Sequence, residues 1–140
     1  MTESELQTQV ADYIRLRYPK VLFHSDFGSG IKLTMGQAIK QKRQNGGRRA
    51  WPDMFIAEPR KAKAFFSVEL NEDIKAPAYS GLFLELKKDG TRIFKKNHDY
   101  ASDHIAEQAE VLAELDKRGY CACFAVGFDE AKKIIDEYLE

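Results

Sequence analysis

The segment that most constrains the fold is residues 81–87, which read GLFLELK. Its side chains are apolar at successive positions, so a strand made from them presents apolar side chains on both faces and is expected to be fully buried. At its end, Glu85 and Lys87 stand two residues apart and therefore on one face of the strand. Burying such charges costs several kcal/mol unless they are paired or bind a metal, so this pair requires a partner or a function.

Helices and strands alternate around this segment. Amphipathic spacing and terminating residues predict helices at residues 3–18, 34–45, 98–118 and 129–139. Apolar runs predict strands at residues 21–24, 53–57, 82–87 and 120–126. The expected helix caps are Thr2 or Ser4, Thr34 and Asp129, and the helix at residues 98–118 is expected to start near Ser102. Strands separated by helices predict an α/β architecture whose central sheet is covered on its faces, while residues 58–80 could form an extended hairpin or a loop.

Length and composition narrow the class of protein. A chain of 140 residues is expected to form one domain, spanning residues 1–140. No apolar run approaches the ~20 residues of a membrane span, and the N-terminus lacks signal-peptide features, so we expect a cytoplasmic protein with no membrane association. Cys121 and Cys123 project from the same side of one strand, which is poor geometry for a disulfide, and no zinc-ligand cluster accompanies them.

The net charge is zero, but the charges are segregated along the chain. Residues 27–52 contain no acid, whereas residues from Asp99 onward contain eleven acids against four bases. A second basic group follows residue 86, although Glu85 and Asp89 dilute it. A single run of this kind is usually a solvated face, but two runs flanking the same charged strand favour contact with phosphates. The residues expected to bind nucleic acid are Lys40, Lys42, Arg43, Arg48, Arg49 and Lys88.

Asp53 and Glu85 together would supply two hard oxygen ligands to one divalent ion. Asp53 is the first residue of an expected apolar strand and directly follows Pro52. Glu85 and Lys87 lie at the end of another expected strand. Mg²⁺ suits such a pair because it prefers octahedral oxygen coordination and retains waters. Lys87 could orient the attacking water, neutralise charge on a phosphate or act as a base, and the sequence leaves these three roles open.

The order Pro52-Asp53, then Glu85-Leu86-Lys87, resembles the PD-(D/E)xK nuclease superfamily, and more closely its VRR-NUC branch in the standalone, phage-like form. The similarity extends to the GGRRAWPD approach at residues 46–53, the Glu107-Gln108 pair and the segment from Gly119 to Ala131. It implies a restriction-endonuclease-like core, in which helices flank a central mixed β-sheet. It also implies the host-cell cytoplasm if the chain is phage-encoded.

The resemblance also implies roles for individual residues. Asp53 and Glu85 would bind Mg²⁺, with Mn²⁺ as a substitute, and Lys87 would be the catalytic lysine. Gln108 matches a glutamine on the helix after the catalytic strand, and it faces inward because it follows Ile105 by three residues and precedes Leu112 by four.

An acid on the first helix often completes such sites, and here Glu3 and Glu5 compete. We prefer Glu3 because it shares the inward face of Leu6 and Val10, although an ordinary first-turn acid would also be favourable at that position.

These features predict a metal-dependent DNA endonuclease that hydrolyses phosphodiester bonds. The resemblance adds branched or structured DNA, in the manner of Holliday-junction resolvases, and a homodimer. The alternatives are a nucleic-acid-binding module that does not cleave and a structural partner of a larger replication complex. Trp51 is interpreted as a core anchor beside the site rather than a base-stacking platform, and the three histidines as surface or loop residues.

Overall fold

The computed structural model describes residues 1–26, 32–48 and 50–140. Its elements in chain order are α1 (Glu3–Arg17), β1 (Phe23–Ser25), α2 (Met35–Gln44), β2 (Met54–Ile56), β3 (Lys63–Ser67), β4 (Glu72–Ala76), β5 (Leu82–Lys87), α3 (Asp103–Lys117), β6 (Cys121–Val126) and α4 (Phe128–Leu139). The glycine-rich loop after β1 and Arg49 lie outside the described residues.

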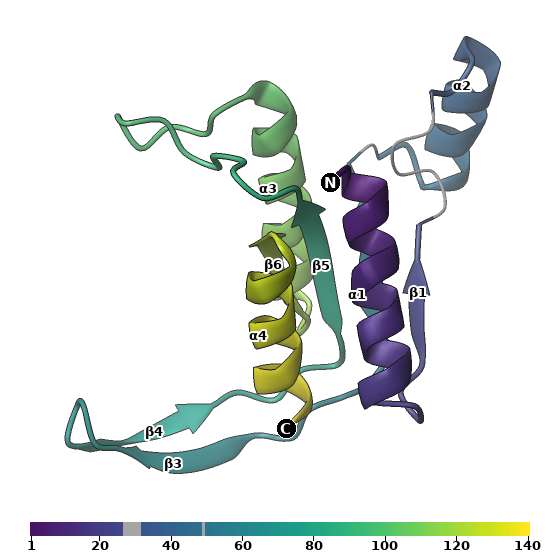
Figure 1. Cartoon of the computed structure of the whole chain (residues 1–140). Coiled ribbons are helices and arrows are strands. Elements are labelled where there is room, and N and C mark those ends of the chain that lie inside the picture. The colour runs from purple at the N-terminus through teal and green to yellow at the C-terminus, as the bar shows by residue number, and fades with distance from the viewer. Residues whose placement is uncertain (27–31, 49) are drawn as a thin grey trace.

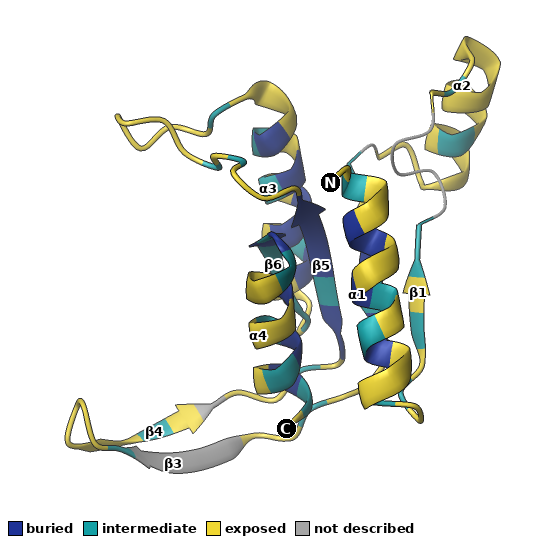
Figure 2. Cartoon of the chain, in the orientation of Figure 1, coloured by how far each residue is buried: buried dark blue, intermediate teal, exposed yellow. Residues whose placement is uncertain are grey.

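The central sheet has four strands in the order β1-β2-β5-β6 (Figure 1). β1 pairs with β2 and β2 with β5 in antiparallel directions, whereas β5 and β6 run parallel. The sheet is therefore mixed, and the predicted α/β architecture is confirmed. β5 lies between two partners and is buried on both faces along most of its length, as its sequence predicted (Figure 2).

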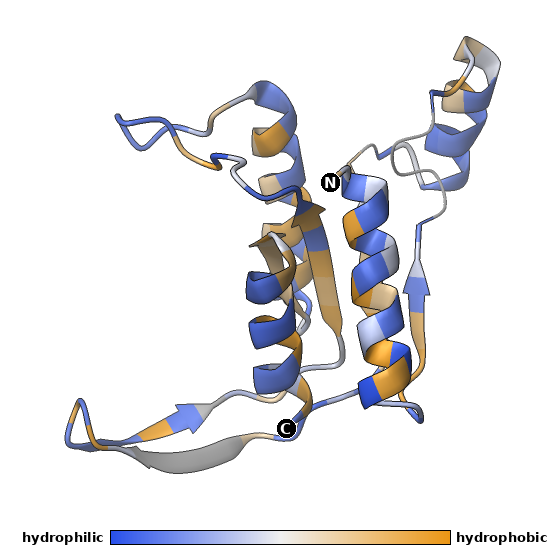
Figure 3. Ribbon diagram, viewed as in Figure 1, coloured by the Kyte–Doolittle hydropathy of each residue, from blue (hydrophilic) through white to orange (hydrophobic). Residues whose placement is uncertain are grey.

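Helices cover the two faces of the sheet with different side chains. α1 and α4 pack together over one face of the sheet, and their hydrophobic residues join those of β2 and β5 in one core; the hydrophobic stretch of β5 is visible in Figure 3. The buried core on this side contains Leu6, Val10, Ile14, Met54, Ile56, Leu82, Leu84, Leu86, Ala125, Ala131, Ile135 and Tyr138. α3 contacts β6 and buries Ile105, Val111, Leu112 and Leu115. Because neighbouring residues on β5 face opposite ways, Glu85 and Lys87 project on the side opposite Leu84 and Leu86.

The ambiguous segment of residues 58–80 forms a β-hairpin. β3 and β4 pair with each other in a separate two-stranded sheet that extends away from the central sheet (Figure 1). A bridge between Arg60 and Tyr79 closes the base of the hairpin, where the Arg60 guanidinium also lies over the Tyr79 ring. Of the two alternatives that the sequence left open for residues 58–80, a hairpin or a loop, the structure shows the hairpin.

The caps predicted for α1 and α2 are correct, α3 begins next to Ser102 as expected, and the cap predicted for α4 is wrong. Thr2, Thr34 and Ser102 each accept a hydrogen bond from a backbone N–H in the first turn of their helix. α4 instead begins after Gly127, whose φ of 82° places it in the left-handed region, and Asp129 lies inside the first turn. A Cβ at residue 127 would lie 3.2 Å from the Asp89 carboxylate, so glycine suits both the turn and the close approach.

Two expectations from composition can be compared with the structure. Cys121 and Cys123 are both free thiols and partly buried. No helix among the described residues combines the length and the apolar character that crossing a bilayer requires.

A polar cluster joins α1 to α4 at the end of α1 remote from Glu3. The hydroxyls of Tyr13 and Tyr18 donate to one oxygen of Asp136 at 2.5 and 2.7 Å, and the Lys132 ammonium lies 3.0 Å from the other. Partial burial alone would raise the pKa of Asp136, but these donors outweigh it and lower the pKa to about 2. The ionised carboxylate therefore stabilises the fold.

We expect Asp136→Asn to lower the free energy of unfolding by about 1 to 3 kcal/mol at pH 7, the usual contribution of hydrogen bonds to a charged group. Because the folded pKa lies below the ordinary value of 3.8, this contribution is present above pH 3.8 and is lost as the pH falls toward 2. Urea unfolding at pH 7, 5 and 3 measures it. Glu137→Gln, an equal charge change at an exposed residue of α4, is the control. Equal stability of wild type and Asp136→Asn at pH 7 would contradict the prediction.

Candidate functional site

The pairing of β2 with β5 brings the two predicted metal ligands together. Met54 pairs with Leu84 and Phe55 with Phe83, so the same antiparallel register, continued by one residue, sets Asp53 beside Glu85 on one face. The Asp53 side chain also accepts the backbone N–H of Leu86 at 2.8 Å. Asp53 is thus fixed to the strand that carries Glu85.

Gln108 and Lys87 both approach the Glu85 carboxylate. The amide nitrogen of Gln108, on α3, donates to Oε1 of Glu85 at 2.6 Å. The Lys87 ammonium lies 3.8 Å from the same oxygen. The exposed fractions of Glu85, Lys87 and Gln108 are only 4%, 6% and 5%, so α3 and the sheet enclose all three polar groups. The inward orientation inferred for Gln108 from helical spacing agrees with its position.

Burial and like charges together perturb the two carboxyl groups. Burial, followed by repulsion from Asp53, raises the pKa of Glu85 to about 9, and Lys87 offsets only part of this effect. Burial also raises the pKa of Asp53, against the stabilising N–H of Leu86. Glu3 adds further negative charge near both groups. A proton or a cation between these acids would relieve the repulsion.

Two buried oxygens on the side chains of the Glu85 and Gln108 pair have no hydrogen-bond partner among the described residues. They are Oε2 of Glu85 and Oε1 of Gln108, which belong to residues already joined by a hydrogen bond. Unpaired buried acceptors are costly, and hard oxygens with free lone pairs are the ligands that Mg²⁺ prefers. Within the described part of the chain, no three His, Cys, Asp or Glu side chains form a ready metal cluster. Two carboxylates with waters completing the shell are usual for Mg²⁺, so the donor set fits this ion.

The two acids at the start of α1 have different surroundings. Glu5 is exposed, and its carboxylate accepts the backbone N–H of Thr2 at 2.9 Å in a capping box. Glu3 is half-buried and contributes to the electrostatic environment of Asp53 and Glu85. The structure places Glu3 rather than Glu5 near the site, while a metal-binding role for Glu3 stays a prediction.

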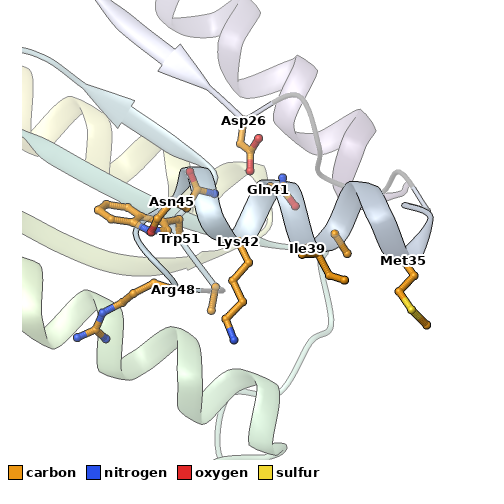
Figure 4. Close-up of a pocket in the computed structure, with 10 residues that line it drawn as sticks. Asp26, Met35, Ile39, Gln41, Lys42, Asn45, Arg48 and Trp51 are labelled. Carbon is orange, nitrogen blue, oxygen red and sulfur yellow. The ribbon is translucent and has the colours of Figure 1, made fainter.

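The described members of the predicted basic set are exposed, and most lie on or after α2. Lys40, Lys42 and Arg43 belong to this helix, which buries none of its side chains, and Arg48 follows it. Lys88 is exposed directly after β5. Lys42 and Arg48 line a cavity of about 460 Å³ between α2 and the segment that leads to Asp53 (Figure 4). All of the described members of the predicted set are accessible to a phosphate backbone.

Near the site, one residue was misinterpreted from the sequence and another was overlooked. Trp51 is 40% exposed, so the interpretation of this residue as a core anchor is wrong. Gln7 is buried on α1, and its amide donates to the Asp26 carbonyl at 2.8 Å. The N–H of Asp26 in turn donates to the Asp53 carbonyl at 2.7 Å. The sequence did contain a sign that Gln7 is buried, because this polar residue lies on the apolar face of the first helix. Gln108 has the same kind of position on α3.

Comparisons with known proteins reveal a similarity to a solved structure. No protein-family profile matches the chain, and no curated protein matches it. A solved structure described as a VRR_NUC domain protein matches with a TM-score of 0.63 and 28% sequence identity. The similarity covers 99% of this chain and 88% of that chain, so the likeness extends over the whole architecture, including every element that carries a candidate site residue.

The buried Glu85 carboxyl predicts that stability depends on pH when no divalent ion is present. Its folded pKa of about 9 exceeds the ordinary value of 4.5, so stability is greatest below pH 4.5 and falls as the pH rises toward 9. Glu85→Gln removes this ionisation and should stabilise the fold by at least about 1 kcal/mol at pH 8, with little effect at pH 4.5. Thermal unfolding in chelator at both pH values measures the difference. Glu110→Gln, at an exposed position of α3, serves as control, and a destabilised Glu85→Gln at pH 8 would disprove the expectation.

Proposed function

We propose that this chain is a metal-dependent DNA endonuclease of the VRR-NUC type that hydrolyses phosphodiester bonds, and its similarity to a VRR_NUC domain protein supports this proposal. The observation that supports this most strongly is the buried Glu85 carboxylate. It has one oxygen without a partner, Asp53 beside it and the Lys87 ammonium on the same face. A site that existed only for stability would gain little from such an arrangement, because burial and mutual repulsion raise the pKa values of both carboxyl groups and their ionisation therefore lowers the free energy of unfolding.

Asp53 and Glu85 are the residues that would hold Mg²⁺, or Mn²⁺ in its place, with Glu3 as the third acid. An ion bound there would polarise a phosphodiester and lower the pKa of a coordinated water. The Leu86 N–H fixes the Asp53 carboxylate, and the Gln108 amide fixes that of Glu85, so both ligands are oriented before any ion binds.

Lys87 and Gln108 have further roles in this proposal. The Lys87 ammonium is held within the site by its 3.8 Å contact with Glu85, and it would balance negative charge that develops on the scissile phosphate. The carbonyl oxygen of Gln108 lacks a partner and would accept a hydrogen bond from the attacking water. Lys40, Lys42, Arg43, Arg48 and Lys88 would bind phosphates away from the reacting centre.

We extend the proposal to branched or structured DNA, cleaved by a dimer in the cytoplasm, or in the host-cell cytoplasm if the chain is phage-encoded. A dimer would place two sites at once on the strands of a junction. Sedimentation of the free protein and of its complex with a four-way junction would test the stoichiometry.

The first test is cleavage of supercoiled plasmid, linear duplex and a synthetic four-way junction with Mg²⁺, Mn²⁺ or chelator. We expect metal-dependent cleavage that falls by at least about a hundredfold in Asp53→Asn and Lys87→Ala, because each removes a group from the reacting centre. DNA binding by these variants, measured by gel shift, should persist. Lys20→Ala, an exposed lysine remote from the site in sequence, is the matched control. Failure to cut any substrate with either metal would instead favour a binding module that does not cleave.

A second test separates the two acids of α1. Glu3→Gln should weaken Mg²⁺ binding and cleavage by about tenfold or more, because Glu3 adds negative charge beside Asp53 and Glu85. Glu5→Gln keeps an acceptor for the capping box and should leave both unchanged. Thermal shift against Mg²⁺ concentration reports binding independently of cleavage. Equal behaviour of the two variants would remove Glu3 from the site.

A further inference from the structure

Trp51 is held in a defined orientation, yet much of its ring faces solvent. Its indole N–H donates to the Asn45 carbonyl at the end of α2, with a distance of 3.3 Å. Its ring centroid lies 6.4 Å from that of Phe83 on β5, at an interplanar angle of 52°. These contacts restrict the ring while 40% of the residue stays exposed. Part of this large apolar ring therefore stays in contact with water, which is unfavourable, and the ring contributes only partly to the hydrophobic core.

Two neighbouring cavities share Trp51 as a wall. The larger, of about 460 Å³, is also lined by Lys42 and Arg48, which supply positive charge. The smaller, of about 210 Å³, is lined by Trp51, Asp53, Phe55 and Phe83. Asn45 and Asp26 contribute to both cavities. One path therefore leads from the basic side chains after α2, past the indole ring, to the proposed metal ligand Asp53.

We propose that Trp51 stacks on an unpaired base of the DNA strand that the site cleaves, while Lys42 and Arg48 hold its phosphates. This inference rests on the proposed nuclease function and names its substrate class: DNA that is single-stranded next to the scissile phosphate. Aromatic side chains beside a basic groove bind single strands because every base offers a flat face, whereas pairing and stacking hide that face in duplex DNA.

Charge defines the direction of the strand across the larger cavity. Lys42 and Arg48 extend to one side of α2, whereas Asp26 approaches from β1 on the other side (Figure 4). Lys42 and Arg48 are the basic side chains among the described residues that line this cavity, and they attract phosphates to their side. The phosphates therefore lie on the Lys42 and Arg48 side, and the base lies against Trp51. With Pro52 alone between Trp51 and Asp53, the stacked nucleotide is next to the reacting phosphate.

Trp51 is the single tryptophan of the chain, so its fluorescence reports the contact directly. We titrate the full chain, in chelator, with a thymidine oligonucleotide and with a blunt duplex of equal length, and check by gel that neither is cut. Saturable quenching by the single strand, weakened by salt, with little quenching by the duplex, is expected. Absence of quenching by the single strand, or equal quenching by both DNAs, would overturn the proposal.

Variants give a second readout through the anisotropy of a labelled oligonucleotide. Trp51→Ala should weaken single-strand binding by about five- to a hundredfold, Trp51→Phe should weaken it less, and duplex binding should change little. Leu22→Ala, an exposed apolar residue at the other end of β1, is the control. Circular dichroism establishes that each variant is folded. Unchanged single-strand affinity in folded Trp51→Ala would overturn the stacking role.

The remaining outcomes separate this inference from its premise. Quenching without cleavage of any DNA contradicts the proposed nuclease function and leaves the stacking contact in place. Cleavage without quenching contradicts the stacking contact alone. A Trp51 emission that shifts with protein concentration in the absence of DNA, in step with dimer formation by light scattering, would show that a second copy covers the ring and would overturn the proposal.

Discussion

The pairing of β2 with β5 is the constraint on which the rest of the site depends. It sets Asp53 beside Glu85, and a slip of one residue would turn Asp53 to the opposite face of the sheet. The register is secured on the other face, where Met54, Ile56 and their partners on β5 are almost fully buried against α1 and α4. Apolar burial on one face thus offsets the cost of enclosing charge on the other.

Much of the fold could be predicted from local patterns. The apolar run of β5, the amphipathic stripes of α1 and α3, and caps such as Thr2 depend on residues close together in the sequence. The hairpin between β2 and β5 was harder to predict because its strands pair with each other and its prolines and charges resemble a loop. The cap assigned to Asp129 was wrong because the tight turn at Gly127, which passes close to Asp89, starts α4 earlier.

The candidate site divides in the same way. Strand periodicity placed Glu85 and Lys87 on one face, and helical periodicity turned Gln108 inward, but the position of Gln108 beside them was implied by the family resemblance alone. The exposure of Trp51 depends instead on how far α2 stands from the sheet, and residue type alone indicated the core. Gln7 was overlooked because its partner is a backbone carbonyl nineteen residues away.

The absence of buried side chains from α2 has an energetic consequence for binding. A helix of ten residues gains little from propensity alone, and here its capping box and few neighbouring contacts replace an apolar interface. The free energy that favours the helical state of α2 is therefore small, and salt or temperature can change its sign. Binding to phosphates would order α2 further, and the conformational entropy lost in this way reduces the free energy of DNA binding. The basic side chains of α2 therefore contribute less affinity than their charges suggest, and the DNA is released more easily.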